Sequence, residues 1–473
     1  MRERTSPARR RRTPQGRRRA FPVTTRATQK IPFEVPMSDI RSAYTDTLRF
    51  YGDTTPRELA DRFGTPLYVY NERILRERCR DLMGLSTQPG FGVNYSVKAN
   101  ANPSLLQIIR DEGLVADAMS PGELRMDALG GFTPEEILYI SNNNAPEEML
   151  TALAHGVLIS VDSLSQLDML GGINRGGRVM ARFNPGIGAG HHAKVVTAGK
   201  ATKFGISPDR MDDVFALLKK HEMTLAGINQ HIGSLFMEPE GYLEAAKVLL
   251  KLASALPADV LKRLDVIDFG GGFGIPYHKY EGEARLDLAA LGRGLHALIS
   301  GWAASTGYRG RFLVEPGRYV VAECGILLGR VTAVKENAGT RYAGTDIGFN
   351  VLMRPAMYDS FHDLEAYRGD AGNAGESVLQ TVVGNICESG DILAKDRLLP
   401  LLREGDVLGV LDAGAYGFSM ASNYNQRLLP AEVLIQADGS PRLIRRRETP
   451  EDLTRCLDGL VRQPSGQDAG PRG

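Results

Sequence analysis

The sequence has few of the features typical of secreted, membrane-spanning or zinc-binding proteins. Only four cysteines occur among 473 residues, and no two form a CxxC pair: Cys79, Cys324, Cys387 and Cys456. This spacing offers neither a disulfide framework nor a zinc knuckle. No apolar run approaches the roughly 18 to 20 residues of a membrane-spanning helix, and no signal-peptide pattern opens the chain. We therefore expect a cytoplasmic protein with no membrane partner.

Acidic residues are nearly absent from residues 1–36, which hold eleven Lys or Arg against Glu3 and Glu34. Since the whole chain has a net charge of +1, the part from Met37 onward carries −8. The run RRRRTPQGRRR (9–19) is compatible with a nucleic-acid arm or an organelle transit peptide. Its lack of hydrophobic periodicity favours a disordered extension outside the chemistry, with Met37 as an alternative start. The acidic remainder would repel a duplex, so we expect no nucleic-acid partner.

Histidine is scarce too, and metal-binding patterns are missing. The eight histidines are dispersed without HExxH or another ligand spacing. The adjacent His191 and His192 lie in a Gly-rich loop, which we expect to cover a site and not to bind a metal. We predict no metal cofactor.

The body of the chain alternates short β-rich runs with stretches of helical periodicity, such as residues 104–113, 146–156 and 211–222. Eight β-rich runs occur, at residues 93–97, 115–119, 137–141, 157–161, 179–183, 227–231, 266–270 and 311–315. Such alternation indicates βα units around a parallel sheet, and eight units predict a (β/α)8 barrel. In a barrel of this kind the chemistry lies on the loops at the carboxyl ends of the strands.

A β domain is expected after the barrel, because short strand-like runs are separated there by turns rich in Gly, Asp and Asn. The fold class is therefore α/β plus β, a (β/α)8 barrel followed by a C-terminal β-sandwich or β-barrel-like domain. The run TPLYVYN (65–71) precedes the barrel, and we expect it to join the β domain. The predicted parts are a disordered basic extension (1–36), an N-terminal segment joining the β domain (37–72), the barrel (73–318), the C-terminal β domain (319–450), and a C-terminal helix with a frayed tail (451–473).

Lys98 follows the first predicted barrel strand, where its amine would project into the mouth of the barrel. Desolvation and neighbouring positive charge lower the pKa of such an amine, as Schiff-base formation with an aldehyde cofactor requires. The alternative is a surface lysine, which is the usual state of a lysine considered alone. The motifs that accompany Lys98 favour the chemical role.

Three motifs after later strands supply the other parts of such a site. DFGGGFG (268–274) offers backbone N–H groups as a phosphate cradle, although glycine runs also occur in plain turns. This run is not GxGxxG, so a dinucleotide site lacks support. HIGS (231–234) adds an imidazole that can lie against an aromatic ring, and a hydroxyl for a phosphate. EPGR (315–318) adds a carboxylate that can keep a pyridine nitrogen protonated. With Lys98, these groups predict a pyridoxal phosphate site.

The order and spacing of six motifs resemble those of the fold-type III, pyridoxal-phosphate-dependent decarboxylases: YSVKAN (95–100), HIGS, GGGFG, EPGR, CESGD (387–391) and GAYGF (414–418). The resemblance covers about residues 45 to 445. Within that family, residues 182–206 and the run MRPAMYDSFH (353–362) are most similar to the branch specific for diaminopimelate. The resemblance implies the cofactor pyridoxal 5'-phosphate and the decarboxylation of meso-2,6-diaminopimelate to L-lysine, the last step of lysine biosynthesis.

The resemblance also implies roles for single residues. Lys98 would form the Schiff base, His231 would stack on the cofactor ring, and Glu315 would contact the pyridine nitrogen. The phosphate would be held by Ser234, Gly271, Gly272 and Tyr416. A head-to-tail homodimer is implied, in which Cys387 crosses the interface and protonates the carbanion.

The far end of the substrate can be argued from charge. meso-Diaminopimelate carries a second amino-acid head, so a site that selects it needs cations there. Arg318 and Arg354 would bind the distal carboxylate bidentately. Tyr358 would donate a hydrogen bond, Glu388 would neutralise the distal ammonium, and Tyr416 is placed in the same group. The alternative for Arg354 and Tyr358 is a structural pair in a loop.

Two competing hypotheses remain at the level of sequence. A decarboxylase of the same fold could act on carboxynorspermidine, ornithine or a carrier-bound amino acid, against which Arg354 and the GHH loop argue. An ornithine-type site would want an acidic group in place of the additional arginine. A catalytically dead homologue could instead bind a protein partner, and the retention of Lys98, Glu315 and Cys387 argues against this.

Overall fold

The computed structural model describes residues 43–186, 189–190, 203–367 and 377–457. The predicted basic extension, the pair His191 and His192, and the predicted tail beyond residue 457 lie outside the described residues. All described residues belong to one unit, Ser42–Gly473. Within them, no helix combines the length and the apolar character that a bilayer crossing requires.

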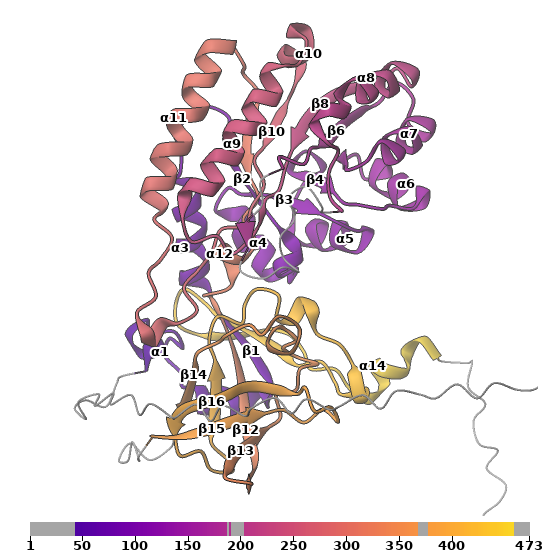
Figure 1. The fold of residues 1–473 in the computed structure, drawn as a ribbon. Coiled ribbons are helices and arrows are strands. Elements are labelled where there is room, and N and C mark those ends of the chain that lie inside the picture. The colour runs from indigo at the N-terminus through magenta and orange to yellow at the C-terminus, as the bar shows by residue number, and fades with distance from the viewer. Residues whose placement is uncertain (1–42, 187–188, 191–202, 368–376, 458–473) are drawn as a thin grey trace, which may run out of the picture. The chain divides into compact units, whose positions relative to one another are not determined.

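Eight parallel strands close into a barrel, which confirms the predicted (β/α)8 class (Figure 1). In order around the barrel they are β10 (Val266–Asp268), β11 (Arg311–Val314), β2 (Phe91–Tyr95), β3 (Val115–Ala118), β4 (Ile137–Ile140), β5 (Leu158–Val161), β6 (Arg178–Arg182) and β8 (Thr224–Asn229). Each β-rich run of the sequence supplies one of these strands. Apolar side chains from four of them, β4, β6, β10 and β11, form a separate core cluster: Leu138, Ile140, Met180, Val266 and Leu313. Side chains from different strands thus fill a packed interior.

Helices follow the strands and surround the barrel (Figure 1). They are α3 (Glu72–Met83), α4 (Pro103–Asp111), α5 (Pro121–Gly130), α6 (Pro146–Ala154), α7 (Leu164–Ile173), α8 (Met211–Lys220), α9 (Pro239–Ser254), α10 (Ala258–Arg263), α11 (Leu288–Thr306) and the single turn α12 (Arg318–Val321). Side chains of Asn102, Ser120 and Ser163 cap α4, α5 and α7 by accepting hydrogen bonds from amides of the first turn. These caps fix where each helix begins, directly after a strand-end loop.

A mixed sheet follows the barrel, and the early run 65–71 supplies one of its strands, as predicted. Its strands are β1 (Leu67–Asn71), β12 (Gly325–Asn337), β13 (Thr340–Thr345), β14 (Leu364–Tyr367), β15 (Ser377–Val383), β16 (Ile392–Pro400), β17 (Val407–Val410), β18 (Ala431–Ile435) and β19 (Pro441–Arg445). β1 lies between β12, to which it is antiparallel, and β18, to which it is parallel. Shorter elements are α1 (Tyr44–Thr47), α2 (Pro56–Phe63), α13 (Arg354–Tyr358), α14 (Pro450–Thr454), β7 (Ala189–Gly190) and β9 (Gly233–Ser234).

The first barrel strand ends earlier than the sequence pattern predicts. β2 stops at Tyr95, and Lys98 lies on a turn of 3-10 helix, Val97–Ala99. The backbone N–H groups of Ser96 and Val97 donate to the Pro316 carbonyl oxygen and to a carboxylate oxygen, at 3.1 and 2.9 Å. Because these donors leave the sheet ladder, the chain turns at this point and aims the next residues across the barrel mouth.

Candidate active site

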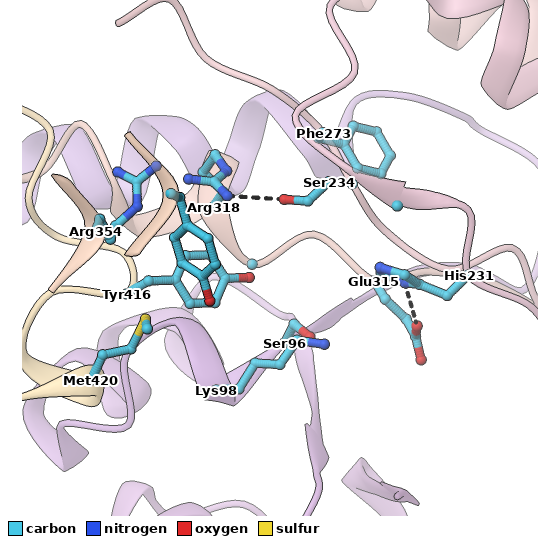
Figure 2. Close-up of a pocket in the computed structure, with 14 residues that line it drawn as sticks. Ser96, Lys98, His231, Ser234, Phe273, Glu315, Arg318, Arg354, Tyr416 and Met420 are labelled. Atoms are coloured by element: carbon cyan, nitrogen blue, oxygen red, sulfur yellow. Dashed lines mark hydrogen bonds and ion pairs between the residues drawn. The ribbon is translucent and has the colours of Figure 1, made fainter. Parts of the chain in front are cut away.

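One pocket at the carboxyl ends of the barrel strands gathers most of the predicted site residues (Figure 2). It is lined by Ser96, Lys98, His231, Gly233, Ser234, Gly272, Phe273, Glu315, Gly317, Arg318, Arg354, Tyr358, Tyr416 and Met420. The first ten come from loops of the barrel, and the last four come from the β domain. Segments far apart in the chain therefore build one site.

Lys98 is held at the pocket by a buried aspartate that the sequence analysis missed. Asp117, on β3, accepts hydrogen bonds from Ser96 Oγ at 2.8 Å and from Val97 N at 2.9 Å. Burial, together with the charge of Glu315, raises the pKa of Asp117 to about 7. An aspartate inside the otherwise apolar run VADAM was the available signal, because a side chain in a barrel strand points either into the barrel or toward a helix.

Glu315 and His231 lie side by side in the pocket (Figure 2). Glu315 directly follows β11, and its Oε2 is 3.6 Å from His231 Nδ1. Burial, with Lys98 and Arg182 nearby, lowers the pKa of His231 well below its usual value. The contact therefore joins a neutral imidazole to a carboxylate and is not an ion pair. A neutral ring suits stacking against an aromatic cofactor.

A second buried carboxyl, Asp268 at the end of β10, is hydrogen-bonded to Glu315. Two carboxylates have no donor to offer each other, so this contact needs one shared proton. Burial and the neighbouring Glu315 raise the pKa of Asp268 well above its usual range, which makes Asp268 the protonated partner. Burial also raises the pKa of Glu315, whereas Lys98, Arg182 and the hydrogen bond from Asp268 oppose that rise.

A glycine turn forms the side of the pocket next to Ser234. Gly272 has a φ of +111°, and a Cβ on it would lie 2.6 Å from the Gly233 carbonyl oxygen. The neighbouring Gly271 could carry no Cβ either, because that atom would lie 1.8 Å from the Glu315 carbonyl oxygen. The backbone N–H of Gly271 donates to His231 Nδ1 at 3.2 Å, and Gly271 is outside the lining. Gly233, Ser234 and Gly272 line this side of the pocket.

Arg318 contacts Ser234 on this side of the pocket and Tyr277 outside the pocket lining. It begins α12, directly after the Pro316–Gly317 turn. Its Nη1 donates to Tyr277 Oη at 2.7 Å, and its Nη2 donates to Ser234 Oγ at 2.9 Å (Figure 2). The guanidinium also lies 5.0 Å from the centre of the Tyr416 ring. Tyr277 was not foreseen from the sequence.

Arg354 enters the same pocket from α13 of the β domain. Its side chain is buried, with 2% of the residue exposed. Nη1 lies 2.9 Å from His362 Nε2, Nη2 donates to Ser360 Oγ at 3.3 Å, and the guanidinium lies 4.8 Å from the centre of the Tyr277 ring. Neither Arg354 nor Arg318 forms a salt bridge with any carboxylate of the described residues. Buried cations with only neutral partners suit a pocket whose ligand is anionic.

Tyr416 brings the β domain onto the turn that carries Lys98. It lies in the loop after β17 with a φ of +56°, and its N–H donates to the Ala99 carbonyl oxygen at 2.8 Å. Ser419 Oγ donates to the same oxygen at 3.1 Å. Tyr358 and Met420 line the pocket from the same domain. These contacts set the distance between the lysine and the arginines.

Cys387 and Glu388 do not line this pocket. Both lie in the loop between β15 and β16, where Cys387 is exposed and its N–H donates to Asn425 Oδ1 at 2.9 Å. Glu388 Oε1 accepts a hydrogen bond from Tyr424 Oη at 2.5 Å. A single chain therefore does not bring them to Lys98.

The groups that do meet suit a pyridoxal ring bearing a phosphate. Lys98 offers an amine, Glu315 a buried carboxylate for a ring nitrogen, and the turn at Gly272 a surface that no side chain fills. In the described part of the chain, no group of three or more His, Cys, Asp or Glu side chains is placed to hold a metal ion.

Comparisons with known proteins agree with this chemistry. Residues 75–322 match the family described as "Pyridoxal-dependent decarboxylase, pyridoxal binding domain". Diaminopimelate decarboxylase from Methanothermobacter thermautotrophicus is 41% identical over 402 residues, which cover 84% of this chain and 92% of that protein. A crystal structure of diaminopimelate decarboxylase matches with a TM-score of 0.79 and 32% identity, over 85% of this chain and 96% of the other. The Helicobacter pylori enzyme complexed with L-lysine matches with a TM-score of 0.78 and 29% identity, over 86% and 100%.

Proposed function

Because this chain belongs to the pyridoxal-dependent decarboxylases, and among them to the diaminopimelate decarboxylases, we propose that it converts meso-2,6-diaminopimelate to L-lysine and CO2. It is then a carboxy-lyase of the last step in lysine biosynthesis. One observation supports this substrate above others of the family. Arg318 and Arg354 are buried in the pocket of Lys98, and their hydrogen-bonding partners are all neutral.

Pyridoxal 5'-phosphate, when bound, supplies the electron sink that accepts charge as CO2 leaves. Lys98 would hold it through the amine and Glu315 at the ring nitrogen, with the neutral His231 against the ring. Its phosphate would lie at Ser234 and at the turn of Gly272, with Tyr416 beside it; Gly271 would contribute to this turn through its backbone position. The hydrogen bond from Asp268 stabilises the ionised form of Glu315, as a protonated ring nitrogen requires.

At the other end, Arg318 and Arg354 would bind the distal carboxylate of the substrate, with Tyr358 donating a further hydrogen bond. Arg318 also contacts Ser234, so it stands between the phosphate end and the distal end. A substrate with a neutral or cationic tail would leave two buried guanidinium groups without a counterion, which is the basis for selecting diaminopimelate over ornithine.

A homodimer is part of the proposal, because Cys387 and Glu388 lie outside the pocket of their own chain and Cys387 is exposed. In the dimer, Cys387 of one chain would deliver a proton to Cα of the substrate in the other, and Glu388 would neutralise the distal ammonium. A cytoplasmic location is also proposed, since all four cysteines are unpaired.

The test is CO2 release by the purified protein with pyridoxal 5'-phosphate, comparing meso-diaminopimelate, ornithine, lysine and carboxynorspermidine. Release from meso-diaminopimelate alone is expected. The Lys98→Ala variant, prepared in the same way, is the control for uncatalysed release. Release from another of the four would overturn the assignment of the distal arginines but keep the decarboxylase chemistry. No release from any, with the cofactor bound, would mean a non-catalytic homologue.

A further inference from the structure

We propose that His362 is a positioning residue for the distal carboxylate, holding Arg354 in the pocket by accepting a hydrogen bond through Nε2. The proposal rests on the proposed function, since it concerns the end of the pocket that distinguishes diaminopimelate from other substrates. His362 does not line the pocket, and it acts through Arg354.

Two hydrogen bonds determine which nitrogen of His362 carries a proton. Nδ1 lies 2.7 Å from the Leu411 carbonyl oxygen, and Nε2 lies 2.9 Å from Arg354 Nη1. A carbonyl oxygen only accepts, so Nδ1 must be the donor. A guanidinium only donates, so Nε2 must accept with its lone pair. The neutral imidazole protonated at Nδ1 is the species that satisfies both contacts.

The surroundings keep this ring neutral. His362 is 2% exposed, and burial together with the charge of Arg354 lowers its pKa well below the usual value. A second proton would place an N–H of a cation against the N–H of the guanidinium. Arg318 and Arg397 act in the same direction, whereas the Leu411 carbonyl opposes them.

A rigid part of the β domain carries His362. It follows α13 and comes two residues before β14, which pairs with β17 in antiparallel register. The N–H of Leu411 donates to the Asp363 carbonyl oxygen at 3.0 Å, so the backbone pairing continues one residue beyond β14 and β17, up to the residue that follows the histidine. The ring also packs edge-on against Tyr277 at a centroid distance of 5.3 Å. Backbone pairing thus sets where Nε2 points.

A neutral acceptor is the residue type that can orient Arg354 without neutralising it. A carboxylate at position 362 would form a salt bridge with the guanidinium and compete with the substrate carboxylate. An apolar side chain would leave Arg354 with Ser360 as its remaining hydrogen-bond partner and with the face of Tyr277. Imidazole fixes the plane of the guanidinium fork and leaves its charge for the ligand.

The experiment measures ligand binding to the holoenzyme. L-Lysine, the product, still carries the distal amino-acid head of the substrate with its carboxylate. Cadaverine has the same carbon chain but lacks this carboxylate. The side chains introduced by His362→Met and His362→Gln are nearly isosteric, but only the glutamine amide has an NH2 group that donates and a carbonyl oxygen that accepts, both in one plane. His362→Met should weaken L-lysine binding about 10-fold or more and change cadaverine binding by less than about 2-fold. His362→Gln should stay within about 3-fold of wild type for both. His296→Met, on α11 and bonded to Ser86, is the matched control.

Kinetics give a second signature, since His362→Met should raise KM for meso-diaminopimelate with a smaller effect on kcat. The proposal would be overturned if His362→Met bound L-lysine with wild-type affinity. It would also be overturned if the Met and Gln variants lost the same affinity for L-lysine, or if His362→Met lost as much affinity for cadaverine as for L-lysine. If His362→Met does not fold, long-range nitrogen–proton NMR of the wild-type protein with labelled histidine identifies which ring nitrogen of His362 is protonated. Protonation at Nε2 would contradict the inference. A wild-type enzyme inactive on meso-diaminopimelate would overturn the proposed function itself.

Discussion

Arg354→Met should remove selectivity for the distal carboxylate while leaving the fold intact. The guanidinium is buried, and its protein partners His362 and Ser360 are neutral, so the substrate carboxylate would be its counterion. Two charge-assisted hydrogen bonds of about 1.5 to 2 kcal/mol each give about 3 to 4 kcal/mol. This corresponds to a fall of about 150- to 1,000-fold in kcat/KM for meso-diaminopimelate.

The same substitution should hardly change the free energy of unfolding. Burial lowers the pKa of Arg354, which shows that its charge is held without full compensation. Methionine gives up two hydrogen bonds but also relieves that desolvation, so the net change should stay within about 1 kcal/mol.

The assay is steady-state CO2 release with Arg354→Lys as the matched control, and urea unfolding of each variant. Lysine keeps the charge but loses the planar fork, so an intermediate fall of about 10-fold is expected. Activity of Arg354→Met within about 3-fold of wild type would refute the argument that this residue binds the distal carboxylate.

Three further predictions concern the lysine, the cysteine and a buried aspartate. Lys98→Ala should show no visible imine absorbance when pyridoxal 5'-phosphate is added and unchanged circular dichroism; a retained absorbance would contradict the role of Lys98. Cys387→Ala should lower kcat about 100-fold or more with near-normal cofactor affinity. Mixing it with Lys98→Ala should restore up to about a quarter of wild-type activity, because half of the dimers then contain one intact site; no recovery would place the cysteine's target in its own chain. Asp127 has no hydrogen-bond partner among the described residues for either carboxylate oxygen, and burial raises its pKa to about 9. Because the folded protein binds this proton more tightly than the unfolded chain, the contribution of Asp127 to stability is fully present below pH about 4 and is lost as pH rises toward 9. Asp127→Leu should therefore raise Tm more at pH 8 than at pH 5. An equal change at both would disprove the raised pKa of Asp127.

The barrel could be predicted because its signal is local. The β-rich runs are mostly buried on both faces, and helices such as α4 and α8 have an apolar stripe, so the two periods alternate visibly in the sequence. Position along the strand was less certain, as Lys98 shows. Its turn depends on Asp117, which comes from the next strand, and no local pattern reports that a side chain from another strand will take the donor of Val97.

The residues that line the pocket were predictable where one motif supplies one group, as with Lys98 and Glu315. Residues that act through a partner were missed. Asp268 matters because it faces Glu315, and His362 because it faces Arg354. Such pairings join segments from different elements, and a single sequence does not show which segments will meet.

The position of β1 bears on how this protein is made. β1 is synthesised before the barrel, yet one of its neighbours, β18, follows the whole barrel, with Leu67 opposite Ala431. During translation, the nascent chain must carry an apolar strand with an unpaired edge until residues near the carboxyl terminus leave the ribosome. An exposed edge strand invites pairing with other chains. A chain truncated before β18 should therefore be prone to aggregation even though every barrel strand is present.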